Sequence, residues 1–272
     1  MHQLQVFLTS HAPDGLLPWG AQEESAERFG LTLHQVEEAA LAAGILPARY
    51  QRNGKTLSVE QQYKLFKSRV AVMGCGGLGG YILEELARLG VGDIVAVDFD
   101  VFEEHNLNRQ LLSCPDEIGR LKVDAAAERV AKINPAVKFT AFSEAFATEN
   151  GPVILEGVQV AVDALDSVGA RLALVAVCKE LKLPFVHGAI CGWYGQVATQ
   201  YPGDGTVEKL YRSCTEDKGM EKIYGNPSFT PAVIASLQVA EVCKVLLDQG
   251  KTLRNRVFYL NLLDMELEEL QL

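Results

Sequence analysis

Residues 69–100 read RVAVMGCGGLGGYILEELARLGVGDIVAVDFD, and this stretch decides the fold. Residues 69–74 are a mostly apolar run of the length expected for a buried strand. Residues 80–90 repeat apolar side chains at helical spacing and stop at a glycine, which predicts a helix. Residues 93–100 form a second apolar run that closes on acidic side chains. A strand, a glycine-rich turn, a helix and another strand predict the start of a Rossmann-like α/β fold.

The chain beyond this stretch goes on alternating between strand-like and helix-like patterns. Strands are predicted at 137–142, 158–165 and 184–190, and helices at 119–135, 169–182 and 232–250. Residues 195–204 predict an antiparallel strand with a turn, and residues 256–270 are strand-like. The expected fold class is therefore α/β, with a Rossmann-like, mostly parallel sheet covered by helices and an antiparallel C-terminal extension.

The segment 1–48 precedes this pattern and is expected to form a helical accessory segment. Thr32 is a suitable N-cap, Gly44 is a suitable stop, and apolar residues recur at helical spacing between them. Residues 49–66 are polar and are interpreted as a lead-in to the first strand of a main domain that spans 49–272. The sequence predicts no function for the accessory segment.

Composition and charge argue against several kinds of protein. The chain has 272 residues, is 48% hydrophobic and carries a net charge of −10, so it can bury a substantial core. The acidic balance argues against a broad nucleic-acid-binding face. No secretory signal is visible, and no apolar stretch is expected to approach the roughly 20 residues of a membrane span. We expect a cytoplasmic protein that enters no membrane.

The cysteines and histidines lack the spacing of a metal site. The six cysteines, at 75, 114, 178, 191, 214 and 243, form no CxxC pair, and the five histidines form no HExxH pattern. No zinc or other protein-held transition metal is therefore expected. Most of the cysteines are expected to be reduced and structural.

The turn GCGGLG at residues 74–79 is the first part of a predicted nucleotide site. Gly74, Gly76 and Gly77 permit a tight turn and a close approach of the backbone to phosphates, where the N-terminus of a helix favours an anion. Asp98 ends the second strand, where a carboxylate can accept a hydrogen bond from a ribose hydroxyl. No GxxxxGK[ST] motif occurs, so the site is not a P-loop.

The residues after this acid indicate a polyphosphate ligand. The segment HNLNRQ at 105–110 supplies amides and an arginine, and Lys122 follows on the next predicted helix. Amide side chains orient phosphate and ribose oxygens, whereas Arg and Lys neutralise the charge of a polyphosphate. Asp166 in VDALDS, at the end of a predicted buried strand, is available for Mg²⁺. Either Asp166 or Ser167 could instead cap the helix that follows.

Together these motifs resemble the ThiF/MoeB/HesA family, the bacterial relatives of ubiquitin-activating enzymes. The resemblance runs from about Arg49 to Gly250 and includes RYQRNG, GCGGLG, HNLNRQLL, VDALDS, GQV followed by PGD, and SLQVAE. It implies that residues 49–272 form a homodimeric adenylation domain that uses ATP and Mg²⁺. The implied substrate is the C-terminal glycine of a ubiquitin-like sulfur carrier of the ThiS or MoaD type, with pyrophosphate as the second product.

The resemblance also implies a role for each matching residue. Gly77 would approach the phosphates, and Asp166 would coordinate Mg²⁺ beside the α-phosphate. Arg109 and Lys122 would bind phosphate oxygens and act in catalysis, whereas Arg52 would act in the site of the partner subunit. The other implied nucleotide-binding residues are Gly74, Gly76, Asp98, His105, Asn106, Asn108, Gln110 and Ser167.

The chain departs from the family pattern in its C-terminal half. Many relatives bind a structural zinc through two CxxC pairs, which this chain lacks, and Ser167 stands where relatives often have asparagine. Cys214 lies where relatives have a mobile crossover loop, and it is either a nucleophile activated by basic neighbours such as Arg212 or an ordinary loop cysteine. Packing is the simpler explanation of Cys191 and His187.

Other functions stay open on the sequence alone. VDALDS and the lack of CxxC pairs also fit the tRNA threonylcarbamoyladenosine dehydratases, but a net charge of −10 weighs against a tRNA substrate. A non-catalytic module that binds a nucleotide or a carrier is disfavoured by the intact set of Arg109, Lys122 and Asp166. An NAD-dependent oxidoreductase is disfavoured because no separate substrate domain is evident. The sequence does not identify the carrier or its pathway.

Overall fold

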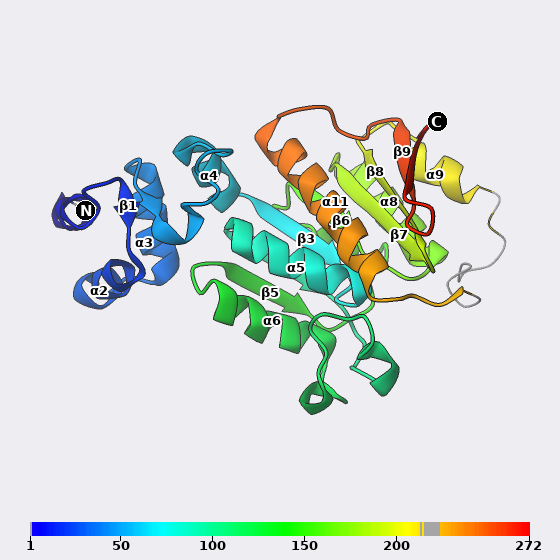
Figure 1. Ribbon diagram of the computed structural model, residues 1–272, viewed down its shortest axis with the longest axis horizontal. Helices are drawn as coiled ribbons and strands as arrows, with labels where there is room; N and C mark the ends of the chain where they lie inside the picture. The colour runs from blue at the N-terminus through cyan, green and yellow to red at the C-terminus, as the bar shows by residue number, and fades with distance from the viewer. Residues whose placement is uncertain (1, 213, 215–223) are drawn as a thin grey trace.

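The computed structural model describes residues 2–212, 214 and 224–272, and these residues are built around one large sheet (Figure 1). The strands of the sheet are β3 Arg69–Met73, β4 Asp93–Val97, β5 Lys138–Phe142, β6 Val160–Asp163, β7 Phe185–Cys191, β8 Tyr194–Gln200, β9 Arg256–Asn261 and β10 Glu266–Gln271. Their order is β10-β9-β8-β7-β6-β3-β4-β5. The strands from β5 to β7 pair in parallel, and β8, β9 and β10 extend the sheet antiparallel. The predicted fold class is confirmed.

Helices cover both faces of the sheet (Figure 1). One face carries α5 Gly77–Leu89, α6 Lys122–Ile133 and α11 Phe229–Leu247, and the other carries α7 Gly151–Ile154, α8 Val168–Glu180 and α9 Thr206–Tyr211. In β3, Val70 and Val72 pack on the first face, whereas Ala71 and Met73 pack on the second. A parallel strand that is covered on both faces must be apolar throughout, which explains the continuous run that the sequence shows.

The predicted strands and helices of this domain are present, with ends that differ by a few residues. The helix predicted from residue 80 begins at Gly77, because the glycine turn itself enters the helix. The strand predicted to end at residue 100 ends at Val97. The short helices α7 and α9 were not predicted. Short 3-10 turns, η2 Glu104–Asn106 and η3 Pro115–Glu117, interrupt the segment between β4 and α6.

The N-terminal segment forms a small helical unit at one end of the molecule (Figure 1). It contains α1 His2–Ser10, α2 Trp19–Phe29, α3 Leu33–Ala42 and a short parallel pair, β1 Leu16–Leu17 with β2 Leu46–Pro47. Its apolar side chains form a core of their own, which includes Leu8, Leu17 and Val36. Thr32 is the N-cap of α3, as the sequence predicted, and the structure adds a reciprocal capping box with Gln35.

Residues 49–66 are not the polar lead-in that the sequence suggested. They include the end of η1 Ala48–Tyr50 and the whole of α4 Val59–Phe66, which Ser58 caps. Tyr50 and Phe66 are buried in a cluster between the N-terminal unit and the sheet domain. The expectation was wrong because the apolar residues are few, although helical spacing gathers them on one side.

Helix α11 also corrects an expectation. By length and composition alone it is apolar enough to cross a membrane, contrary to the expectation of no such stretch, and half of its apolar window is buried inside the protein. It packs on α5 and on β6, β7 and β8. Its buried Gln238 donates to the backbone carbonyl of Asp163, and its buried Glu241 accepts from Thr199. These contacts are typical of a core helix.

Candidate functional site

The sheet has one point at which strand order reverses. Strands β4 and β5 lie on one side of β3, whereas β6 and β7 lie on the other. Ligands of open α/β sheets bind outside the carboxyl ends of strands at such a point. The carboxyl end of β3 runs into the turn 74–79, and the carboxyl end of β6 runs towards Asp166. The geometry therefore gathers two predicted motifs at one edge of the sheet.

The glycines of the turn are required by close backbone contacts. Gly74 has φ +99°, and a Cβ added to it would lie 2.5 Å from the carbonyl oxygen of Ala164. A Cβ on Gly79 would lie 1.8 Å from the carbonyl oxygen of Gly74. Helix α5 starts at Gly77 and has no side-chain hydrogen bond at its N-cap, Gly76. Its first N–H groups therefore face the turn without a capping side chain, which suits an anionic ligand.

Asp98 lies against this turn. One carboxylate oxygen, Oδ2, accepts from the Cys75 N–H across 2.7 Å, and Oδ1 accepts from the Asp100 N–H across 2.8 Å. Burial raises the pKa of Asp98, while the two N–H bonds and Lys122 oppose the rise. The carboxylate predicted to bind ribose is thus fixed beside the backbone predicted to approach phosphate.

Lys122 is buried rather than solvated. It opens α6 with 6% of its surface exposed, and its Nζ lies 2.8 Å from Asp100 Oδ2. The ion pair compensates the cost of burying the ammonium group and holds it close to Asp98. The predicted contact of Lys122 with the phosphates of a nucleotide stays a prediction, and a buried cation beside the glycine turn is consistent with it.

In the segment 105–110, some side chains hold the local turn together and others are exposed, where a ligand could reach them. Asn106 was predicted to line the nucleotide, but its Oδ1 accepts from the Glu103 N–H across 2.9 Å and so closes the local turn. His105 is exposed and contacts the carboxylate of Glu103. Nη1 of Arg109 donates to the carbonyl of His105 and to Oδ1 of Asn108, at 3.0 and 2.9 Å. Burial lowers the pKa of Arg109.

Gln110 has a buried side-chain oxygen beside the turn that could accept a hydrogen bond from a ligand. Its side chain lies over the turn, where a Cβ on Gly76 would be 3.6 Å from its Nε2. It is 6% exposed, and among the described residues its Oε1 has no hydrogen-bond partner. A buried polar atom without a partner is costly, so a donor from a bound molecule would stabilise it. A nucleotide bound beside the turn could supply such a group.

Asp166 lies beyond the strand at whose end it was predicted. Strand β6 stops at Asp163, and Asp166 is exposed three residues later. Ser167 is the N-cap of α8, and its Oγ accepts from the Ala170 N–H across 3.1 Å. The structure thus gives Ser167 a capping role and leaves Asp166 at the sheet edge.

Asp166 suits Mg²⁺ by its chemistry and position. No cluster of three or more His, Cys, Asp or Glu side chains suited to a metal ion occurs within residues 2–212, 214 and 224–272. Mg²⁺ does not need one, because one or two carboxylates together with substrate phosphates are its common ligand set. Asp166 is an exposed oxygen donor at the edge that carries the glycine turn.

Arg52 and Cys214 are not placed with this group. Arg52 is exposed in the turn between η1 and α4. Tyr50, two residues earlier, lies against Gly90, which precedes β4, so this part of the chain is at the amino ends of the strands. Cys214 is exposed just after α9, and residues 213 and 215–223 on either side of it lie outside the described part.

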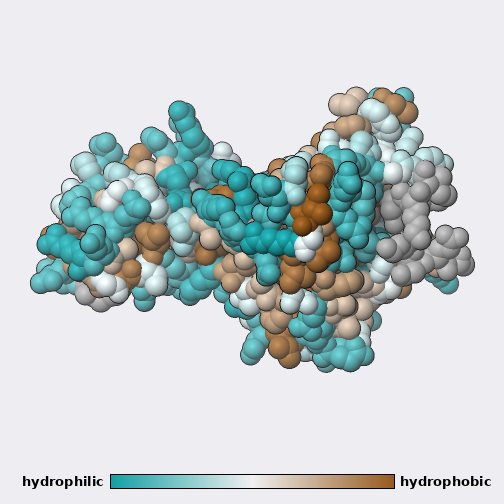
Figure 2. All heavy atoms as spheres, turned by 90° about the horizontal axis from the view of Figure 1, so that it is seen from below, coloured by the Kyte–Doolittle hydropathy of each residue, from teal (hydrophilic) through white to brown (hydrophobic). Residues whose placement is uncertain are grey.

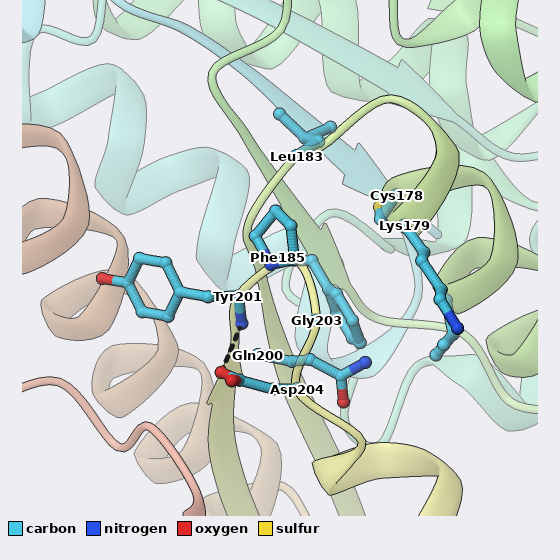
Figure 3. A pocket seen from close by; sticks show the side chains of 10 residues that line it. Cys178, Lys179, Leu183, Phe185, Gln200, Tyr201, Gly203 and Asp204 are labelled. Atoms are coloured by element: carbon cyan, nitrogen blue, oxygen red, sulfur yellow. Dashed lines mark hydrogen bonds between the residues drawn. The ribbon is translucent and has the colours of Figure 1, made fainter.

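A small cavity lies at the opposite end of the sheet from the predicted site (Figure 3). Phe185 at the start of β7 and Gln200 at the end of β8 line it, together with Asp204. Its volume of about 10 Å³ suits one water molecule and excludes a nucleotide.

The sequence did not single out Asp163, Arg171 or Tyr211. Asp163 is fully buried and bonded to Arg171 and His187, and Arg171 also bonds the hydroxyl of Tyr211. A carboxylate inside an apolar strand pattern is the one signal that could have indicated this cluster. His187 is buried and paired, in agreement with the interpretation of an interior histidine.

Several named proteins are similar in sequence to most of this chain. The chain is 35% identical over 211 residues to the SAMP-activating enzyme E1 of Haloferax volcanii, which covers 77% of this chain and 78% of that protein. It is 33% identical over 226 residues to the sulfur carrier protein adenylyltransferase of Thermus thermophilus, with 78% and 81% covered. The molybdopterin-synthase adenylyltransferase of Haemophilus influenzae is 30% identical over 227 residues, with 80% and 90% covered.

Solved structures share the fold at lower identity. E. coli MccB with ATP superposes with a TM-score of 0.66 at 21% identity, covering 82% of this chain and 70% of that one. E. coli tRNA N6-threonylcarbamoyladenosine dehydratase, TcdA, in complex with AMP gives a TM-score of 0.64 at 23% identity, covering 74% and 94%. The ThiF family pattern itself matches residues 50–272. The chain belongs to the ThiF family and is an adenylyltransferase of the ThiF and MoeB type.

Proposed function

We propose that this protein uses ATP and Mg²⁺ to adenylate the C-terminal glycine of a small ubiquitin-like sulfur carrier. The observation that carries the proposal is the meeting of the glycine turn, Asp98, Lys122 and Asp166 at one edge of the sheet. Relatives named for activating SAMP and sulfur carrier proteins, at 35% and 33% identity, support the choice of substrate class.

The reaction needs positioning and charge more than a base. A carrier carboxylate is already ionised at neutral pH, so one of its oxygens can bond to the α-phosphorus without losing a proton. The bond from that phosphorus to the oxygen that bridges to the β-phosphate breaks, and pyrophosphate leaves with the electron pair. Lys122 and Arg109 would offset the negative charge of the phosphates. Mg²⁺ held by Asp166 would neutralise further phosphate charge.

We also propose that the protein works as a homodimer. The segment after β4 exposes five large apolar side chains, Phe99, Val101, Leu107, Leu111 and Ile118. Apolar surface gathers near the middle of the molecule when it is seen from below, the side on which this segment lies in Figure 1 (Figure 2). A second copy would cover such a patch. It would also allow Arg52 of one subunit to act in the site of the other, because within its own chain Arg52 lies near the amino ends of the strands.

Intact-mass spectrometry of candidate carriers tests the proposed function. Carriers that end in Gly-Gly are incubated with the protein, ATP and Mg²⁺, and the masses of all products are recorded. A carrier that gains the mass of AMP with wild-type protein, and not with the Asp166→Ala variant, would establish the activity and name the partner. Carriers of unchanged mass in every reaction would refute it.

A dehydratase acting on threonylcarbamoyladenosine in tRNA is the second candidate. The fold shared with TcdA and the absence of CxxC pairs favour it. The same experiment distinguishes the two, because modified tRNA would then stimulate ATP hydrolysis while no carrier gains mass. The net charge of −10 favours the carrier.

A further inference from the structure

A buried arginine holds the strand end that leads to Asp166. Strand β6 ends at Asp163, whose fully buried Oδ2 lies 3.1 Å from Nε of Arg171 and 2.7 Å from Nδ1 of His187. Burial alone would raise the pKa of Asp163, but Arg171 and His187 outweigh it, so the pKa lies below its usual value. Arg171 belongs to α8, which begins directly after Asp166 and its neighbour Ser167. The ion pair therefore ties the helix after the loop to the strand before it.

The three nitrogens of Arg171 bond three different residues from two parts of the chain. While Nε bonds Asp163, Nη2 donates to the carbonyl of Leu165 across 2.5 Å. Nη1 donates to the hydroxyl of Tyr211 across 3.1 Å, and the guanidinium carbon lies 5.4 Å from the centre of the tyrosine ring. Only a planar fork of donors can make these bonds at once, because a lysine presents a single charged nitrogen.

Helix α11 holds the same strand end from the opposite face of the sheet. Nε2 of Gln238 donates to the backbone carbonyl of Asp163 across 2.8 Å. The amide fits there because Gly188 has no side chain, and a Cβ at that position would lie 2.2 Å from the Gln238 side chain. The backbone is thus fixed at residue 163 by Gln238 and at residue 165 by Arg171. Asp166 is the next residue, so these bonds restrain the backbone that leads into it.

Tyr211 extends the connection to a second region. It is the last residue of α9, and the N–H of Cys214 donates to its carbonyl across 3.0 Å. Its hydroxyl also accepts from Nε2 of Gln196 on β8. One guanidinium therefore bonds both the loop in front of Asp166 and the helix in front of Cys214.

We propose, on the basis of the proposed function, that Arg171 is a positioning residue for the Mg²⁺ site. Its bond to the carbonyl of Leu165 holds the backbone next to Asp166 in place. Its bond to the hydroxyl of Tyr211 makes the position of that backbone depend on α9 as well. Arg171 itself touches neither nucleotide nor metal in this proposal. Replacing a residue that orients a metal ligand, without touching the metal itself, commonly weakens metal affinity by about 10-fold to 100-fold.

Binding of Mn²⁺, a paramagnetic substitute for Mg²⁺, tests the proposal without any turnover. The protein is saturated with a non-hydrolysable ATP analogue, Mn²⁺ is added in steps, and free Mn²⁺ is measured by electron paramagnetic resonance. We expect Arg171→Lys to raise the half-saturating Mn²⁺ concentration about 10-fold. Tyr211→Phe keeps the buried ion pair and removes the bonds that the hydroxyl makes with Arg171 and Gln196, so we expect a smaller rise of about 3-fold. Calorimetry without metal should give analogue affinities that match wild type.

Arg254 supplies a control of similar geometry, although more exposed, at the other end of the sheet. Its guanidinium pairs with Asp204 at 2.9 Å and lies 5.1 Å from the ring centre of Tyr201, much as Arg171 lies between Asp163 and Tyr211. Arg254→Lys and Tyr201→Phe should leave the half-saturating Mn²⁺ concentration at its wild-type value. A rise in these controls equal to that of the test variants would overturn the proposal, because it would indicate general loosening of the fold.

Two further outcomes would refute the positioning role of Arg171, and a third would refute only the proposed substrate. An unchanged Mn²⁺ requirement in either Arg171→Lys or Tyr211→Phe would refute the positioning role, and so would a wild-type complex that binds no Mn²⁺. If wild-type protein binds Mn²⁺ with the analogue but modifies no carrier, only the proposed substrate fails. Tyr211→Phe guards against misfolding, because it leaves the charge of Asp163 paired.

Discussion

Tyr50 donates its hydroxyl to the buried carboxylate of Glu37 across 2.7 Å. The bond joins α3 of the N-terminal unit to the first residues of the sheet domain, and Nδ2 of Asn134 donates to the same hydroxyl across 2.8 Å. Burial raises the pKa of Glu37 from 4.5 to about 7, although the bond from Tyr50 opposes the rise. The contact between the two parts is therefore sensitive to pH.

Glu37→Gln should stabilise the protein in alkaline solution. An acid whose pKa rises on folding contributes stability below its unfolded value of 4.5 and loses it as the pH rises through about 7. The amide cannot ionise and can still accept from Tyr50, so the free energy of unfolding should rise by up to about 3 kcal/mol at pH 8 and by much less at pH 5. Urea unfolding at both values measures this.

The neighbouring Glu38 is the control for that experiment. A hydrogen bond from Lys67 lowers the pKa of Glu38, so its contribution to stability is lost as the pH falls. Glu38→Gln should therefore bring no gain at pH 8. Equal gains for Glu37→Gln at pH 5 and pH 8 would show that ionisation of Glu37 is not the cause.

Loss of Asp166 or Arg109 should cost more activity than loss of any cysteine. Removing a group that stabilises developing charge commonly lowers kcat by about 10²-fold to 10³-fold. We expect Asp166→Ala and Arg109→Ala to fall in this range when carrier adenylation is followed by mass spectrometry. Cys214→Ala and Cys114→Ala, at exposed positions, serve as comparisons and should retain most of the rate. A larger loss in Cys214→Ala than in Asp166→Ala or Arg109→Ala would assign the Cys214 thiol a direct role in the reaction.

Subunit mixing should reveal the role of Arg52. A homodimer with Arg52→Ala in one chain and Asp166→Ala in the other keeps one site in which both residues are native. Each variant alone should be inactive, and the mixed protein should recover activity per mixed dimer equal to about half that of wild type. Activity that stays at the level of the separate variants would remove the cross-subunit role.

Gly79→Ala should abolish nucleotide binding. The added methyl group would lie 1.8 Å from the carbonyl oxygen of Gly74, so the turn must open. Loss of ATP binding in calorimetry, with a lower melting temperature, is the expected result. Gly20→Ala is the opposite control, because it adds a methyl group in open space within α2 and should stabilise the helix by about 0.5–1 kcal/mol.

Ser167 can be tested as a helix cap. Its Oγ accepts from the Ala170 N–H, so Ser167→Ala should lower the free energy of unfolding by about 1 kcal/mol. Ser167→Asn, the residue that the family pattern often has, can make the same bond and should cost little. A large drop in ATP affinity for Ser167→Asn, measured by calorimetry, would instead assign Ser167 a direct role at the nucleotide.

Most strands and helices could be predicted from local sequence patterns. Those that were not predicted depend on contacts between residues far apart in the sequence. The apolar runs of β3 and β6 and the capped helix after Thr32 are visible in short windows of sequence. Helix α2 is not, because Pro18 and Gly20 open it and no side chain caps it. Its apolar side faces only the small core of the N-terminal unit, so its periodicity is weak.

The residues of the candidate site also differ in how far local sequence indicates their role. Gly74 and Asp98 were predictable because a turn and a strand end impose their own residue types. Asn106 looked equally suited to a ligand, but the structure uses its side chain to close a turn through the Glu103 N–H. Arg171 gave no local sign of importance, since its partners are contributed by β6, the following loop and α9.

The contact between Gly74 and Ala164 limits how this protein could acquire new substrates. Two strand ends touch there with no space for a methyl group on Gly74, so this part of the floor of the site cannot accept a larger residue at that position. Variation has more freedom in the segments around that floor, outside the positions proposed to bind the nucleotide. A search for the determinants of carrier choice should therefore begin with exchanges of those segments among relatives and leave the floor unchanged.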